Sequence, residues 1–172
     1  MERDCKAWIR HSKSALNEGG NKADELPDLV EEADQYLWGG VNSDLTHEVA
    51  SLIPALRKAD EFMEKLWDAL EGRPTLEEAE AILETDPLPI ESPEDFETLN
   101  KSIKSAKEWL AKYKYAYDKD AEPMDSKALD VIVAEATRIP ITIDEAKDLK
   151  ERLSSIKKVA DAVRTCLLYT SD

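Results

Sequence analysis

The chain has 172 residues, of which 42% are hydrophobic and 35% charged, so it can bury a core beneath a very polar surface. Glycine is scarce, at 5 residues, and this composition favours helices over strands. The formal net charge of −15 makes the chain a poor candidate for holding phosphate backbones, so we expect no direct binding of nucleic acid.

Targeting and redox signals are missing from the sequence. The N-terminus lacks a secretory apolar region, and no apolar run approaches the roughly 18 residues needed to span a bilayer. Cys5 and Cys166 lie far apart and show no metal-ligand spacing. We therefore expect a soluble protein of a reducing compartment with no membrane partner.

Residues 1–20 read as the end of a long helix from an upstream repeat. Three of their apolar residues match, 101 positions later, the apolar residues of a second long helix. The matching triplets are Cys5, Trp8, Ile9 and Ala106, Trp109, Leu110. We therefore expect the chain to open inside a repeat array and Met1 not to be a biological start.

Three repeats follow, at residues 24–70, 75–118 and 125–168, each predicted as a short helix, a tight connector and a long helix. Their long helices share six apolar positions with helical spacing. These positions are Leu52, Leu56, Ala59, Phe62, Met63, Leu66; Leu99, Ile103, Ala106, Trp109, Leu110, Tyr113; and Leu149, Leu153, Ile156, Val159, Ala160, Val163. The pattern predicts an all-α fold, an array of antiparallel helical hairpins similar to spectrin or coiled-coil repeats, with no sheet.

The first repeat has weaker signals than the others. Its short helix is predicted to begin near Asp24, with Pro27 in the first turn, and its connector covers residues 38–41. Its long helix either starts at Ser51 or kinks at Pro54, and the sequence leaves both open.

Capping signals mark the helix starts of the later repeats. Thr75 and Asp125 are predicted to cap the two short helices, and Ser92 precedes Pro93 as an N-cap serine. Thr142–Glu145 reads as a T-x-x-E capping box for the last long helix. The prolines after Leu88 and Ile139 predict short extended connectors.

No constellation for catalysis or for a metal or cofactor emerges. His11 and His47 are the only histidines, and neither belongs to a zinc or iron motif, so they are interpreted as exposed residues at helix ends. Cys5 and Cys166 align with buried repeat positions and are interpreted as small core residues. We therefore expect no catalytic, cofactor-binding or metal-binding residue in this chain.

Two features suggest binding. Trp8 and Trp109 occupy repeat core positions, whereas Trp38 stands beside two glycines and is the one candidate partner contact. Residues 71–98 hold ten acidic residues against Arg73 alone. This stretch is interpreted as solvated helix faces, and the alternative is a landing site for a basic peptide.

The connector and core phrases resemble a known family. They read A-x-R-I-P-I-x-I-D-E-x-x-x-L at Ala136–Leu149, P-I-x-S-P-E-D-x-x-x-L at Pro89–Leu99 and A-x-x-W at Ala106–Trp109. The chain resembles the helical lysine-specific demethylase-like domain of the histone demethylases that also carry Jumonji, ARID and PHD modules. The likeness covers nearly the whole chain and is best from about residue 71 to 167.

The resemblance implies a nuclear, chromatin-associated parent that demethylates histone lysine with iron and 2-oxoglutarate. No residue here matches that parent's iron, 2-oxoglutarate or zinc ligands, so this segment would be a non-catalytic scaffold. It would space catalytic and reader modules, with other modules of the same protein and chromatin proteins as its partners. Residues 167–172 depart from the family and resemble a translated sequencing adapter, so we predict a non-native tail. The alternative function is an independent helical adaptor or spectrin-like spacer with no chromatin role.

Overall fold

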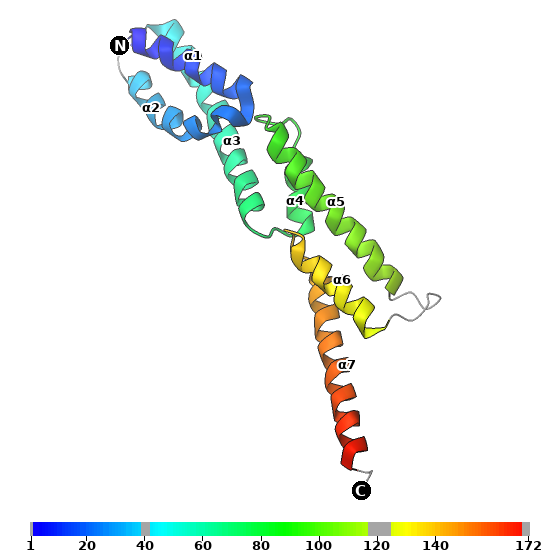
Figure 1. Ribbon diagram of the computed structural model, residues 1–172. Coiled ribbons are helices and arrows are strands. Elements are labelled where there is room, and N and C mark those ends of the chain that lie inside the picture. The colour runs from blue at the N-terminus through cyan, green and yellow to red at the C-terminus, as the bar shows by residue number, and fades with distance from the viewer. Residues whose placement is uncertain (1, 39–41, 117–124, 170–172) are drawn as a thin grey trace. The chain divides into compact units, whose positions relative to one another are not determined.

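The computed structural model describes the backbone of residues 2–38, 42–116 and 125–169 (Figure 1). Within these ranges the chain forms helices and no strand, which confirms the predicted all-α class. The elements are α1 (Glu2–Glu18), the 3-10 helix η1 (Gly19–Glu25), α2 (Leu26–Trp38), α3 (Ser43–Glu71), α4 (Leu76–Leu83), α5 (Pro93–Ala116), α6 (Ser126–Arg138) and α7 (Asp144–Tyr169).

The chain divides into two compact units. Unit 1 comprises Met1–Gly72 and Glu80–Leu99, and unit 2 comprises Arg73–Ala79 and Asn100–Asp172. The division falls inside α4 and α5, so each of these helices contributes residues to both units.

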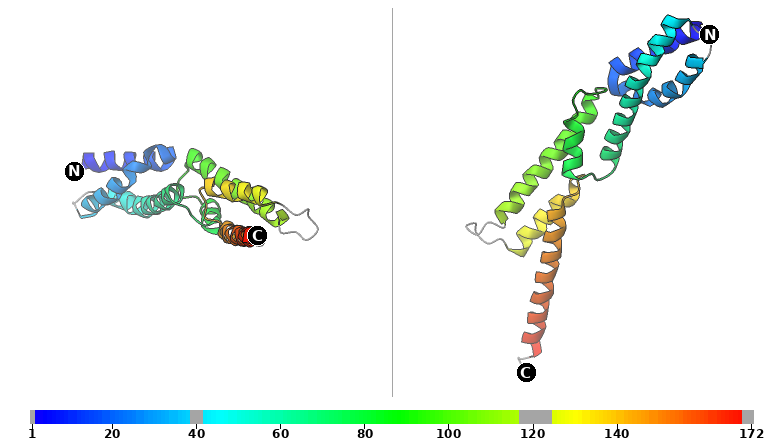
Figure 2. Two further views of the ribbon diagram at one scale, coloured as in Figure 1. Left: turned by 60° about the horizontal axis from the view of Figure 1, so that its bottom comes forward. Right: turned by 180° about the vertical axis from the view of Figure 1, so that it is seen from behind.

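Helices α1, α2 and α3 pack together in unit 1 (Figure 2). The indole N–H of Trp8 in α1 donates to the backbone carbonyl of Leu29 in α2 at 2.9 Å, and the Trp8 ring is buried. The same ring lies 6.0 Å from the ring of Tyr36. Trp8 is thus a core residue, as the repeat pattern predicts.

The second half of α3 is also buried within unit 1. Ala59, Phe62 and Leu66 are inaccessible to solvent or nearly so. The Phe62 ring lies 5.9 Å from the ring of Phe96, in the first turn of α5. The segment Glu80–Leu99 therefore reaches the apolar face of α3 at this pair.

Helix α3 begins upstream of Ser51, so of the two sequence alternatives only a helix that runs through Pro54 remains. Its first residue is Ser43, and the side chain of Asn42 accepts a hydrogen bond from the backbone N–H of Asp44 at 2.7 Å. Pro54 lies inside the helix. The predicted start at Ser51 is wrong because the Asn42 cap starts the helix two turns upstream of it.

Two predicted caps of short helices are confirmed. Thr75 and Glu78 form a reciprocal capping box, in which each backbone N–H donates to the other residue's side chain, at 3.0 and 3.2 Å. The carboxylate of Asp125 accepts from the backbone N–H of Ala128 at 2.8 Å at the start of α6. Ser92 directly precedes α5 as predicted, but its hydroxyl donates to the Asp95 carboxylate at 2.6 Å.

The capping box predicted at Thr142–Glu145 is wrong. Helix α7 begins at Asp144, and the Thr142 hydroxyl donates instead to the backbone carbonyl of Arg73 at 2.6 Å. The Thr142 backbone N–H also donates to the carbonyl of Pro74, at 2.8 Å. Because the Thr142 N–H is used in this tertiary bond, it is not available to the Glu145 carboxylate, as the capping box would require.

The second half of α5 packs on α6 in unit 2. The indole N–H of Trp109 donates to the backbone carbonyl of Ile132 at 2.7 Å, and only 2% of Trp109 is exposed. Lys112 forms an ion pair with Glu135 at 2.8 Å, one turn further along both helices. The predicted core role of Trp109 is therefore confirmed.

Helices α6 and α7 form an antiparallel pair. Ala136, near the end of α6, lines one cavity with Ala146, near the start of α7, whereas Asp130 near the start of α6 pairs with Lys157 at 2.9 Å. Leu149 and Leu153 are buried in this part of α7. The connector residue Ile139 has extended backbone, φ −79° and ψ 124°, as the following proline predicts.

The second half of α7 departs from the predicted core. Ile156, Val159, Ala160 and Val163 are exposed, and so is Cys166, which the sequence placed in the core. Helix α6 has 13 residues and α7 has 26, which correspond to lengths of roughly 20 and 39 Å. The shorter helix can therefore cover only about half of the longer one.

Candidate functional site

The candidate contact Trp38 is the last residue of α2. Its side chain lies outside the described residues, as do the two glycines and Val41 that follow it. A role for Trp38 in binding a partner stays a prediction.

The histidines and cysteines do not come together in the part of the chain that the structure describes. His11 is exposed in the middle of α1, away from a helix end, and His47 is exposed near the start of α3. Cys5 is buried, as predicted. Among the described residues there is no group of three or more His, Cys, Asp or Glu side chains arranged to hold a metal ion.

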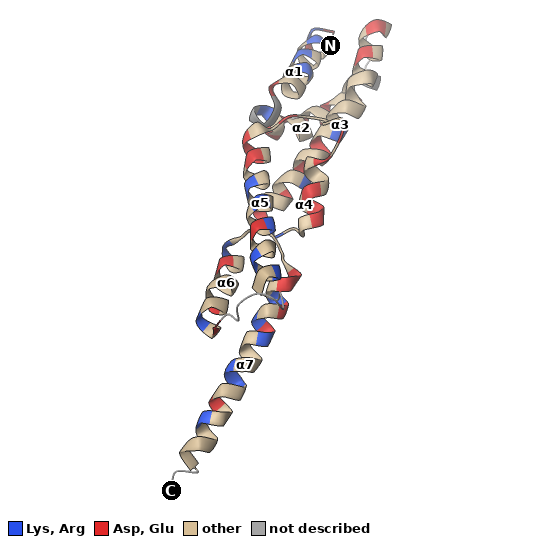
Figure 3. Cartoon of the chain, turned by 90° about the vertical axis from the view of Figure 1, so that its right-hand side faces the viewer, with Lys and Arg blue, Asp and Glu red and all other residues tan. Residues whose placement is uncertain are grey.

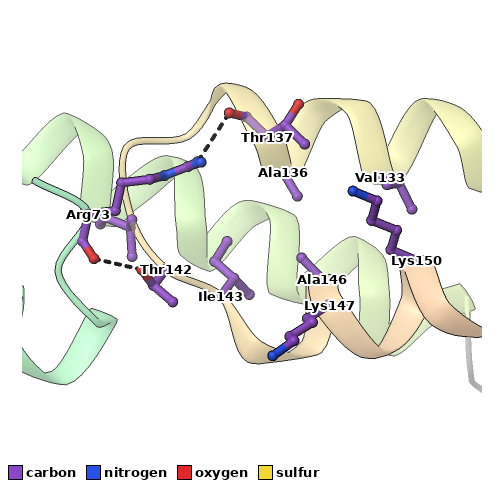
Figure 4. A pocket seen from close by; sticks show the side chains of 10 residues that line it. Arg73, Val133, Ala136, Thr137, Thr142, Ile143, Ala146, Lys147 and Lys150 are labelled. Atoms are coloured by element: carbon purple, nitrogen blue, oxygen red, sulfur yellow. Dashed lines mark hydrogen bonds between the residues drawn. The ribbon is translucent and has the colours of Figure 1, made fainter.

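A cavity of about 230 Å³ lies in unit 2 beside the connection between α6 and α7 (Figure 4). Its basic lining residues are Arg73, Lys147 and Lys150, and no acidic residue lines it. Arg73 donates from Nη2 to the backbone carbonyls of Thr137, at 3.1 Å, and of Ile139. These carbonyls belong to the last turn of α6 and to its C-cap. The helix itself supplies no N–H donors for carbonyls at this end.

Arg73 therefore acts as a structural clamp. Its guanidinium holds the end of α6, while its own carbonyl accepts from the Thr142 hydroxyl. Together these bonds tie the residues that precede α4 to the connector between α6 and α7. The three basic side chains of this cavity could attract an anion, but the Arg73 guanidinium already donates hydrogen bonds to the carbonyls of Thr137 and Ile139.

The sequence did not predict the Arg73 clamp. The one signal in the sequence that could have drawn attention to Arg73 is its position as the single basic residue in the acidic stretch 71–98. A lone cation marks an unusual position, but sequence alone cannot say that carbonyls 64 and 66 residues away are its partners.

An apolar groove of about 570 Å³ runs between α5 and α6. It is lined by Ala111, Lys112 and Tyr115 from α5 and by Ala128, Val131 and Ile132 from α6. Tyr115 and Val131 are both more than half exposed. The groove suits contact with apolar side chains and offers no group for acid–base chemistry apart from Lys112 and the Tyr115 hydroxyl.

A second apolar surface lies on α7, and we call Ile156, Val159, Ala160 and Val163 the α7 stripe. The exposed fractions of its three large residues are 52%, 63% and 54% for Ile156, Val159 and Val163. Their spacing places them on one face of the helix. An exposed apolar stripe of this kind is typical of an interaction surface.

None of the helices within the described ranges is both long enough and apolar enough to cross a membrane. Comparisons with protein-family models, with curated proteins and with solved structures found no match to this chain.

Proposed function

We propose that the chain is a non-catalytic helical scaffold that spaces the catalytic and reader modules of a nuclear, chromatin-associated histone lysine demethylase. The observation that supports this proposal is the role of the residues that carry the family resemblance. Trp109, from the A-x-x-W phrase, joins α5 to α6 through its indole N–H. Ile90 and Ile141, from the two Pro-Ile phrases, are buried at 2% and 1% exposure.

Buried connectors of this kind suit a spacer. Each fixes where one helix ends and the next begins, because the isoleucine after the proline is held in the core. A single helix such as α5, with 24 residues, extends over roughly 36 Å. Helices held in this way keep the modules that they join at a set distance.

The parent's transcript tests the assignment to a demethylase. Long-read sequencing through both sides of this frame is expected to find Jumonji and zinc-finger coding sequence in the same transcript. A transcript with neither would overturn the assignment and leave the independent helical adaptor as the function.

An enzymatic assay tests the non-catalytic role separately. The chain is incubated with trimethyl-lysine histone peptide, Fe(II) and 2-oxoglutarate, and the release of formaldehyde is followed. We expect no turnover, since no ligand set for iron was found in the sequence. Turnover by the purified chain would overturn the scaffold proposal.

A further inference from the structure

The α7 stripe continues an apolar face whose first part is already used. Leu149 and Leu153 on the same face are buried, and exposure begins at Ile156. The apolar face of α7 therefore extends beyond the part that other helices bury. On the regular helix beyond Leu153, Ile156, Val159 and Val163 are all at least half exposed, and so are Leu167, Leu168 and Tyr169 at its end.

Helix α3 shows what meets this face elsewhere in the chain: helices α1 and α2 pack on α3, and the segment Glu80–Leu99 meets it at Phe62. The residues of α3 that match Ile156, Val159 and Val163 in the repeat alignment are Ala59, Phe62 and Leu66. All three are buried, and Phe62 meets Phe96 from the segment Glu80–Leu99. That segment contains the end of a short helix, a Pro-Ile connector and the first turns of a long helix.

The charged residues of α7 indicate which kind of helix would pack favourably on the α7 stripe. Residues 154–169 hold three basic residues and one acidic residue in a chain whose net charge is −15 (Figure 3). Lys157 and Arg164 lie seven residues apart, along one edge of the α7 stripe. Lys157 already pairs with Asp130 of α6, so this edge accepts acidic residues from a neighbouring helix.

The segment that meets α3 at Phe62 has the opposite charge. Glu80–Leu99 holds seven acidic residues and no lysine or arginine. A second copy of α7 would instead bring Lys157 and Arg164 against their own kind, which is unfavourable. The chain's own Glu80–Leu99 segment is already packed in unit 1.

We propose that the α7 stripe is a docking surface for an acidic helical hairpin from outside residues 1–172. Its apolar face covers Ile156, Val159 and Val163, and its carboxylates pair with Arg164 and join Asp130 at Lys157. This inference goes beyond the proposed function and does not depend on the assignment to a demethylase.

The test measures binding of a labelled peptide to the whole chain. The probe is a synthetic peptide with the sequence of residues 74–113, which contains α4, the connector and most of α5, including Phe96, whose ring meets Phe62 of α3. Fluorescence anisotropy is recorded with the wild-type chain, with Val163→Asp alone and with Val159→Asp combined with Val163→Asp. We expect the affinity of the double variant for the peptide to be at least about tenfold lower than that of the wild type. We also expect all forms of the chain to bind the peptide more weakly at high salt.

Matched controls separate the stripe from general charge. Ser154→Asp combined with Thr165→Asp adds the same two charges on the opposite face of α7, where both residues are exposed, and is expected to bind almost as tightly as the wild type. A second probe carries amides in place of the seven acidic residues of its Glu80–Leu99 part and is expected to bind more weakly. Circular dichroism confirms that each variant keeps its helices, as expected for exposed positions.

Several results would overturn the proposal. Equal binding to the double stripe variant, or no binding to the wild type, removes the α7 stripe as the surface. Equal binding of the amide probe removes the acidic character of the partner. Sedimentation that shows a dimer of the wild type and a monomer of the stripe variant makes a second copy the occupant instead.

Discussion

Trp109 on α5 donates its indole N–H to the backbone carbonyl of Ile132 on α6, 23 residues later in the chain. Trp8 makes the same contact with Leu29, from α1 to α2. In both units, therefore, a tryptophan of one helix is bonded to the backbone of the next helix in the chain. Such a bond fixes the rotation of the indole as well as its burial.

Replacement of Trp109 tests how much this contact contributes to stability. Trp109→Ala is expected to lower the free energy of unfolding by about 3–5 kcal/mol, because it removes a large buried ring. Trp109→Phe keeps an aromatic ring but removes the indole N–H that donates to the Ile132 carbonyl, at a cost of about 0.5–1.5 kcal/mol. Urea unfolding followed by circular dichroism measures both, and an unchanged midpoint for Trp109→Ala would contradict the burial of the ring.

Thr142 allows the clamp at Arg73 to be weakened by one bond. Thr142→Val removes the hydroxyl that donates to the Arg73 carbonyl and leaves the backbone bond to Pro74 in place. We expect a loss of about 1 kcal/mol in the free energy of unfolding. The matched control is Thr165→Val, whose hydroxyl bonds only to Asp161 within the same helix and whose loss is expected to be smaller.

The two cysteines are expected to react at very different rates with an aromatic disulfide reagent. Cys166 is exposed, whereas Cys5 is buried. Burial raises the pKa of the Cys5 thiol, and the charges of Glu48 and Glu2 act in the same direction, so little thiolate forms. One thiol should react quickly and the other only after urea is added. Cys166→Ser should abolish the fast phase, and a fast phase that survives in this variant would contradict the buried position of Cys5.

Asp60 gives a pH-dependent prediction. Burial raises the pKa of the Asp60 carboxyl, and the neighbouring charge of Glu61 raises it further. Since the folded-state pKa is the higher one, Asp60 contributes to stability below the ordinary aspartate pKa of about 4, and that contribution is lost as the pH rises through the folded value. Asp60→Asn should therefore raise the Tm at pH 7, and the gain should shrink in acid. A gain of equal size at both pH values would contradict this assignment.

The sequence predicted the parts of the fold that depend on local signals. The helical class, the burial of Trp8 and Trp109 and the caps at Thr75 and Asp125 follow from spacing and from residues within one turn. These features need no knowledge of distant partners. They were therefore accessible from one sequence.

The errors arose where distant residues compete with local signals. Thr142 bonds to Arg73, 69 residues away, rather than to its own helix. The apolar spacing of α7 predicts a buried face, but periodicity does not say whether a neighbour is present to bury it. The candidate surfaces on α5–α6 and α7 were missed for the same reason, since a groove or an exposed stripe depends on where other helices end.

The half-covered state of α7 has a consequence for amide hydrogen exchange. Amides up to about Leu153 sit in a helix whose apolar face is buried, so their exchange requires that packing to open. Beyond Ile156 the helix has little tertiary support, and an isolated helix of this length is marginal in water. Exchange should therefore accelerate abruptly along one unbroken helix, and a docked partner should slow it most in the last four turns.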